Sequence, residues 1–163
     1  MSTVRVTNLV LTSLLLVLSV GCGLDSPTTP DAPLQPPLSS ETCLQGPYTE
    51  TFTSAGGSMG DAYAWFAVPP SALSVSTELS MEVCTGPEPS ATMGPHGQTF
   101  AVACTLSIAK PPSYDPEDTY HIFLWNETTE EWDDLGGVDN GSYVSLAVTH
   151  FSSYKLNCVE SES

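Results

Sequence analysis

Two kinds of hydrophobic pattern divide the chain. From Leu9 to Val20, nine of the twelve residues are Leu or Val and none is charged, so this stretch lacks the polar face of a helix that packs on a soluble core. From about residue 48 onward, apolar residues instead alternate with polar ones or form short runs that end at proline or glycine. The first pattern is typical of a targeting segment, and the second predicts β-strands.

The β pattern recurs in seven segments. Leu79, Met81 and Val83 fall on one face of a strand, because side chains alternate between the two faces. We expect strands at 48–53, 62–68, 77–83, 99–109, 120–125, 142–148 and 151–156. Short strands at near-regular spacing, with Gly, Pro and Asn between them, predict an all-β domain: a single antiparallel β-sandwich, or alternatively a barrel.

Residues 1–21 have the features of a signal peptide. Arg5 supplies a positive start, the apolar run follows, and small residues lead up to Cys22. The run is shorter than the roughly 20 residues that a membrane-spanning helix needs. The sequence from Leu18 to Cys22 resembles a bacterial lipobox, although Ser19 stands where that motif usually has a larger aliphatic residue. We therefore predict cleavage before Cys22 and lipidation of its sulfur, with ordinary signal-peptide cleavage as the alternative.

The expected lipid would hold the chain at the bacterial cell envelope. One acyl chain binds a membrane only marginally, whereas two or more anchor it stably. Gly23 rather than aspartate follows the cysteine, which favours the outer membrane in enteric bacteria. Residues 22–42 then form a proline-rich spacer, 43–158 the single domain, and 159–163 a short tail.

The charge balance excludes several classes of partner. After removal of Arg5, Lys110 and Lys155 are the only fixed cations beside 19 acidic residues. Nucleic-acid binding needs many Lys and Arg side chains to displace counterions, so no nucleic acid is expected as a partner. Docking on anionic lipid is excluded on the same ground.

Four cysteines remain once Cys22 is assigned to the lipid. An even number in a small exported domain predicts two disulfides, and three pairings are possible. We favour Cys84–Cys104, on the expectation that their strands are neighbours, and Cys43–Cys158, which would join the two ends of the domain. No Cys-x-x-Cys pair is present, so a zinc site is not expected.

Several short motifs, in order, resemble the ZU-five domain, a β-sandwich named for zonula occludens proteins and the Unc-five netrin receptors. They cover residues 50–157: Gly56-Gly57, the turn 68–73 (Val-Pro-Pro-Ser-Ala-Leu), a hairpin from Trp125 to Trp132, and the closing strand 149–154 (Thr-His-Phe-Ser-Ser-Tyr). Ser71 departs from the glycine usual in the family. The resemblance implies a module for protein interaction or scaffolding, without an enzymatic substrate or a cofactor.

The resemblance also raises one chemical hypothesis. His150-Phe151-Ser152 matches a triplet that cleaves itself in some relatives. Ser152 Oγ would attack the Phe151 carbonyl with His150 as general base, and water would release the ester. The structural alternative, which we favour, places Phe151 in the core of the last strand and gives His150 an ordinary hydrogen bond.

The remaining candidates are weaker. His96 lies in a predicted loop, and His121 lies inside a predicted strand. The acidic clusters at 115–118 and 130–134 suggest a calcium-dependent adhesion domain, but neither has the spacing of a known calcium loop, and we expect solvated turns. The sequence therefore predicts a non-enzymatic, lipid-anchored β-sandwich that binds an unknown protein partner and holds no metal.

Overall fold

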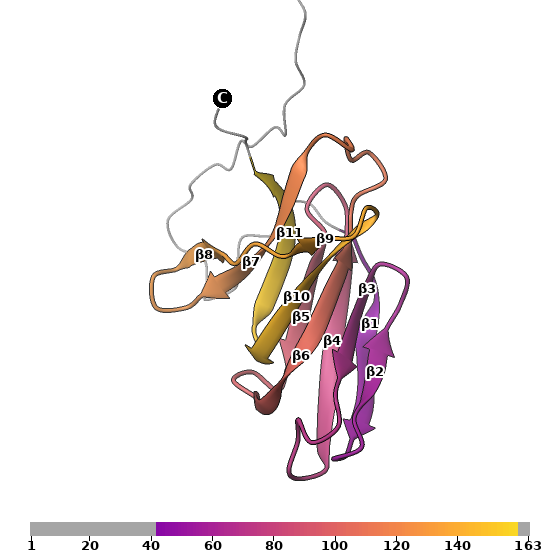
Figure 1. The fold of residues 1–163 in the computed structure, drawn as a ribbon, viewed down its shortest axis with the longest axis vertical. Coiled ribbons are helices and arrows are strands. Elements are labelled where there is room, and N and C mark those ends of the chain that lie inside the picture. The colour runs from indigo at the N-terminus through magenta and orange to yellow at the C-terminus, as the bar shows by residue number, and fades with distance from the viewer. Residues whose placement is uncertain (1–41, 160–163) are drawn as a thin grey trace, which may run out of the picture.

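A computed structural model describes residues 42–159, and this part of the chain is an antiparallel β-sandwich without a helix (Figure 1). The predicted fold class is therefore confirmed. No helix that could cross a membrane occurs among the described residues.

The larger sheet has six strands in the order β1-β4-β5-β11-β7-β8. Their bounds are β1 Thr42–Phe52, β4 Thr77–Thr85, β5 Ser90–Gly94, β11 Ser153–Val159, β7 Thr119–Asn126 and β8 Glu131–Asp134. The smaller sheet has the order β2-β3-β6-β10-β9. Its strands are β2 Gly57–Gly60, β3 Ala64–Val68, β6 Thr99–Ala109, β10 Tyr143–His150 and β9 Val138–Asp139.

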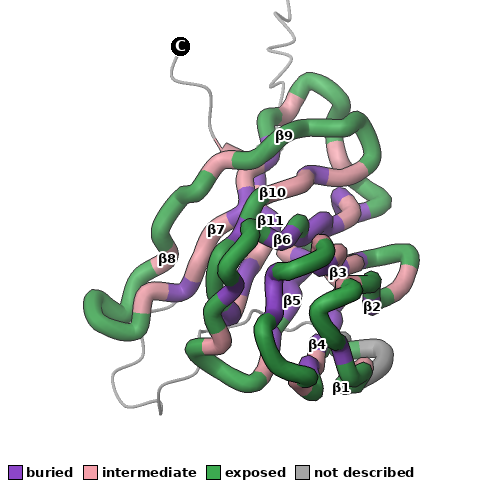
Figure 2. The backbone as a smooth tube through the Cα atoms, turned by 60° about the horizontal axis from the view of Figure 1, so that its bottom comes forward, coloured by how far each residue is buried: buried purple, intermediate pink, exposed green. Residues whose placement is uncertain are grey.

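The core lies between the two sheets, and the buried residues that form it recur along the strands (purple in Figure 2). Leu79, Met81 and Val83 of β4 are buried on one face as predicted. From the opposite sheet, Phe66 packs edge-on against Phe151, with 5.1 Å between ring centroids. Alternation of buried and exposed residues therefore assigns each strand an inner and an outer face.

Each of the seven predicted segments overlaps a strand, and the longest one, 99–109, has the predicted bounds. Three short strands were not predicted, β2, β5 and β9, and β8 was expected only through the hairpin resemblance at Trp125 to Trp132. The last predicted strand begins two residues late, because Phe151 and Ser152 form the connection by which the chain passes from the smaller to the larger sheet.

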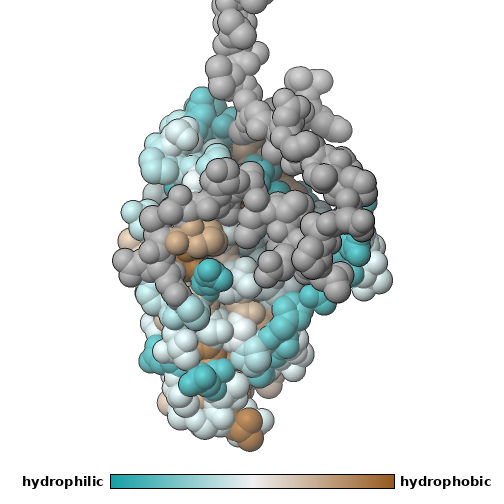
Figure 3. Space-filling view, turned by 180° about the vertical axis from the view of Figure 1, so that it is seen from behind, coloured by the Kyte–Doolittle hydropathy of each residue, from teal (hydrophilic) through white to brown (hydrophobic). Residues whose placement is uncertain are grey.

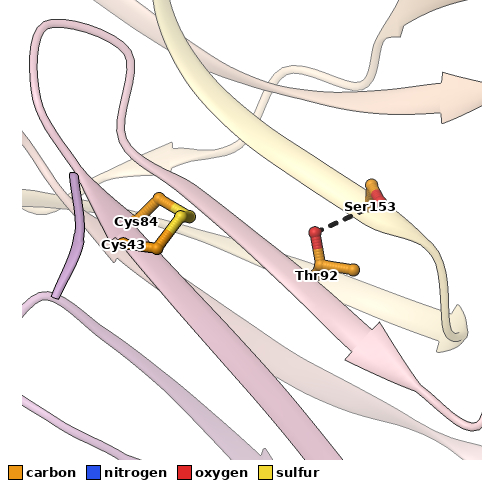
Figure 4. Close-up of a disulfide and its surroundings, with 4 residues drawn as sticks. All are labelled: Cys43, Cys84, Thr92 and Ser153. Carbon is orange, nitrogen blue, oxygen red and sulfur yellow. Dashed lines mark hydrogen bonds between the residues drawn. A yellow bond between two sulfur atoms is a disulfide. The ribbon is translucent and has the colours of Figure 1, made fainter. Parts of the chain in front are cut away.

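The favoured disulfide pairing is wrong. Cys43 is bonded to Cys84, its direct cross-strand partner on β1 and β4 (Figure 4). Cys104 is a free, buried thiol. The expectation failed because β4 and β6, although close in sequence, belong to different sheets, so Cys84 and Cys104 are not on neighbouring strands. Cys158 is disulfide-bonded, but not to Cys43 as predicted.

Candidate functional site

The outer face of the smaller sheet carries no charged side chain over its central rows. Trp65, Ser107 and Ser145 are direct neighbours across β3, β6 and β10. Ala67, Thr105 and Ala147 form the next outward row. Between these two rows, Phe66 and Leu106 point inward and are fully buried, which fixes the outward direction of the rows. We call these six residues the neutral face.

Small side chains make up most of the neutral face. Trp65 meets Tyr143 of the same sheet in an edge-on contact, with 4.8 Å between ring centroids. Beside them, Ser107 donates a hydrogen bond to the Ser145 hydroxyl at 3.2 Å and is 2% exposed. The face therefore combines Trp65, which Tyr143 flanks, with alanine and hydroxyl side chains.

The outer face of the larger sheet is different, because it carries charge. Glu78 and Glu82 of β4 are exposed there, next to the inward-pointing Leu79 and Met81. Lys155 of β11 lies on the same side and pairs with Glu88 at 3.5 Å. Where apolar residues do reach the surface in the space-filling view, they form small separate patches among polar ones (Figure 3).

One aromatic cluster interrupts this charged face. Trp125 of β7 is directly opposite Trp132 of β8, and their ring centroids are 5.4 Å apart. The Lys155 ammonium lies 4.9 Å from the centre of the Trp132 ring, a distance typical of a cation–π contact. Phe123 is the direct cross-strand neighbour of Lys155, in the outward row next to that of the two tryptophans. We call Phe123, Trp125, Trp132 and Lys155 the aromatic cluster.

The His-Phe-Ser triplet lies where the chain crosses between the sheets. Phe151 is fully buried, and its backbone N–H donates to the Gln98 carbonyl at 2.8 Å. Ser152 is also buried, and its hydroxyl donates to the Trp125 carbonyl at 3.3 Å. His150 is exposed, and no hydrogen bond found among the described residues joins its imidazole to Ser152.

The backbone around the triplet is closely hydrogen-bonded. The Phe151 carbonyl accepts from the Gly97 N–H at 3.4 Å, which is the one contact that resembles an oxyanion donor. The His150 carbonyl accepts from the Tyr154 hydroxyl at 2.7 Å. These contacts hold the crossing in place, and self-cleavage between Phe151 and Ser152 stays a prediction.

The other histidines pair with single carboxylates. His121 lies on β7, and its Nδ1 is 2.9 Å from both carboxylate oxygens of Asp134. Burial raises the pKa of Asp134, but the hydrogen bonds from His121 and from the Gly136 N–H outweigh it, so the net pKa is lowered. His96 Nε2 lies 3.3 Å from Glu127 at the surface.

Carboxylates of the two acidic clusters accept hydrogen bonds from nearby residues. Asp115 accepts the Glu117 N–H at 2.9 Å, and Asp133 accepts the Asn126 amide at 2.9 Å. Within residues 42–159, no group of three or more His, Cys, Asp and Glu side chains is arranged to hold a metal ion. Calcium binding therefore stays an untested alternative.

Lys110 is the most buried cation of the described chain. Its side chain is 2% exposed and its Nζ donates to Asp139 Oδ2 at 2.8 Å. Tyr114 and Tyr120 lie 5.0 and 5.1 Å from the ammonium. The hydrogen bond from Lys110 is the main reason that the pKa of Asp139 is lowered.

A groove of about 410 Å³ opens where β4 and β6 end. Four prolines line it, together with Tyr63 and Lys110: Pro87, Pro89, Pro111 and Pro112. Its lining is mostly apolar and has no group that is placed for catalysis.

The fold thus defines the class of this protein as an antiparallel β-sandwich with one neutral and one charged outer face. The chain matches no known protein family, and no curated protein is similar to it in sequence. The ZU-five resemblance is consistent with the class and stays a prediction.

Sequence reasoning missed both surface features. The neutral face could have been found by assigning outward positions to β3, β6 and β10, since each outward residue there is uncharged in a strongly acidic chain. Trp125 and Trp132 were noted in the sequence, but only as part of a resemblance. It was not predicted that their rings form a cluster with Phe123 and Lys155. The predicted lipid site, Cys22, lies outside the described residues.

Proposed function

We propose that this protein is a lipid-anchored, non-catalytic β-sandwich that binds a protein partner at the bacterial cell envelope through the neutral face. The observation that carries the proposal is the absence of charge from this one described face in a chain with formal net charge −16. Charged residues are depleted at the centre of protein–protein interfaces, because burying them without a partner is costly.

The chemistry of the face fits a protein partner. Trp65 and Tyr143 offer the large aromatic area on which binding energy concentrates, and the surrounding alanine and hydroxyl residues allow a flat close approach. The ZU-five resemblance, which implies an interaction module, supports the same function.

The first experiment is site-specific photo-crosslinking in the native cells. A photo-reactive residue replaces Ala147 on the neutral face, and a matched control replaces Glu82 on the outer face of the larger sheet. We expect one discrete adduct from position 147 and none from position 82. A charge placed next to it by Thr105→Asp should remove the adduct, because Thr105 is the direct neighbour of Ala147. Equal labelling from both positions, or none from 147, contradicts the proposal.

The anchor is tested separately by the mass of the N-terminal peptide from protein purified out of the membrane. The predicted thioether to lipid uses the Cys22 sulfur, so the peptide should carry acyl chains before and after reduction. An unlipidated peptide, or one bonded to Cys158 and released by reduction, rules out the anchor. The same sample tests self-cleavage, since a cut chain would yield a peptide that begins at Ser152.

A further inference from the structure

Trp125 is buried in an unusual place. It is 8% exposed, yet it is the one buried aromatic residue of the described chain that stands outside the core cluster between the sheets. Its register opposite Trp132, and the position of Lys155 over that ring, place it on the outer side of the larger sheet. Burial of this ring is therefore not explained by the packing of the two sheets.

Both tryptophans of the cluster also have a buried donor without an acceptor. The Nε1–H groups of Trp125 and Trp132 are shielded from solvent, and neither has a hydrogen-bond partner within residues 42–159. An indole N–H can only donate, and buried donors in folded proteins nearly always have a partner. Two such donors side by side indicate that an acceptor from outside residues 42–159 belongs here.

We propose that the proline-rich segment 23–41 of the same chain docks on the aromatic cluster and that its backbone carbonyls accept from Trp125 and Trp132. This segment contains three overlapping Pro-x-x-Pro repeats, at 27–30, 30–33 and 33–36. Segments of this kind adopt the polyproline II conformation, whose carbonyls have no internal hydrogen bonds. Such segments are bound by aromatic grooves, where the rings pack on the prolines.

The strand register leads the segment toward the cluster. The chain enters the sheet at Thr42, next to Cys43, and Cys43 begins a row of direct cross-strand neighbours that ends beside the cluster: Cys43, Cys84, Ser90, Lys155 and Phe123. Four strand spacings separate the ends of this row, roughly 19 Å at about 4.8 Å each. A polyproline II segment rises about 3.1 Å per residue, so six or seven residues before Thr42 cover this distance. A chain one strand spacing longer, which brings in Pro33 to Pro36, would be long enough to reach the two indoles.

The docking changes what the proline-rich segment does. Residues 23–41 would lie along the sandwich instead of extending as a free spacer, so the domain would be held close to whatever surface binds the start of the chain. The proposal goes beyond partner binding by the neutral face and does not depend on lipidation of Cys22.

The test uses the indole N–H signals of the full mature chain in ¹⁵N NMR spectra. Trp65, on the neutral face, is the internal reference. We expect the Trp125 and Trp132 indole protons to exchange with solvent at least about tenfold more slowly than that of Trp65, as hydrogen-bonded donors do. Replacing Pro33, Pro36 and Pro37 by serine should shift both signals and speed their exchange, whereas replacing Pro27 should have a much smaller effect.

A second variant changes the aromatic cluster instead of the proline-rich segment. Trp132→Phe keeps an aromatic ring and removes one donor, so it should speed exchange of the Trp125 indole proton, and Trp65→Phe should not. Indole signals that the triple proline substitution leaves unchanged would overturn the proposal. Protection that disappears on dilution would also overturn it, because the segment would then come from a second copy of the chain.

Discussion

Lys110 shows how one residue holds a region of the surface together. Burial of an ammonium group is costly unless the group is paired, and Lys110 has Asp139 as its counter-charge and the faces of Tyr114 and Tyr120 on two sides. Asp139 belongs to β9, a strand of two residues at the edge of the smaller sheet. The ion pair therefore helps to fix an element too short to be stable alone.

We predict that Asp139→Asn lowers the free energy of unfolding by about 1–2 kcal/mol at pH 7, because the buried ammonium loses its counter-charge while Asp139 itself is half exposed and partly screened. Glu78→Gln, an exposed acid on β4, is the control and should be nearly neutral. Denaturant unfolding measures both.

The pKa of Asp139 is lowered, so its contribution to stability is present above the ordinary aspartate pKa near 4 and is lost as pH falls through the folded value. The two proteins should converge in acid.

Cys104 sets a second pH dependence. Burial raises its pKa from 9.0 to about 11, so the folded chain keeps a proton that the unfolded chain loses. Stability from this thiol is complete below pH 9 and is lost as pH rises from about 9 to 11. We predict that Cys104→Ala unfolds with a shallower alkaline slope in this range. Val148→Ala, a cavity at the cross-strand neighbour, is the control and should keep the original slope.

At the scale of elements, β1 is held to β4 both by cross-strand pairing and by a disulfide. It is an edge strand whose pairing with β4 is irregular at two points between Cys43 and Tyr48. The Cys43–Cys84 bond closes a loop of 41 residues, which in the chain-entropy model stabilises the fold by roughly 4 kcal/mol. The bond is thus the main link at the start of the domain.

We predict that the double variant Cys43→Ser, Cys84→Ser loses most of this stabilisation and that amide exchange rises first in β1. The control is the double variant Thr51→Ser, Glu78→Gln. These two residues are direct neighbours on the same two strands, but no covalent bond joins them. Native-state hydrogen exchange distinguishes local release of β1 from global unfolding. Uniform loss of protection over both sheets would contradict the local role.

The crossing from β10 to β11 gives a prediction that separates structure from chemistry. Phe151→Ala should cost about 3–5 kcal/mol, because the ring is fully buried between Phe66 and Phe100. Ser152→Ala should cost about 1 kcal/mol for one hydrogen bond, and His150→Ala almost nothing. Thermal unfolding gives this order. A chain that is cut before Ser152, and left intact in both the His150 and Ser152 variants, would instead show that the triplet is catalytic.

How far the sequence predicts this fold depends on the length of each strand. Periodicity found β4 and β6, where five or more positions alternate or stay apolar, but β5 has only five residues with glycine at its end, and β9 has two. Pairing was less predictable still, since Cys84 and Cys104 lie 20 residues apart in the sequence but in different sheets. The neutral face arises from three strands that meet only in the fold, so no local motif marks it.

For the whole molecule, the outstanding property is the acidic excess. The chain has 19 acidic residues and three Lys or Arg, and the described part has four ion pairs, two of which involve histidine. A surface of this composition repels itself, and the repulsion is larger in the compact state than in the unfolded chain. The neutral face is a region where another molecule can approach without adding to this repulsion.

Salt should therefore stabilise this protein. Raising NaCl from about 0.01 M to 0.15 M shortens the Debye length from roughly 30 Å to 8 Å and should raise the melting temperature by a few degrees. A fold held chiefly by surface ion pairs would respond with the opposite sign.

Ca²⁺ and Mg²⁺ compared at equal ionic strength then separate screening from binding. Equal shifts indicate screening of dispersed carboxylates, such as those at 115–118, which are engaged in their own turn. A rise specific to Ca²⁺ would instead favour the calcium-dependent adhesion domain and place a site outside the arrangements seen in residues 42–159.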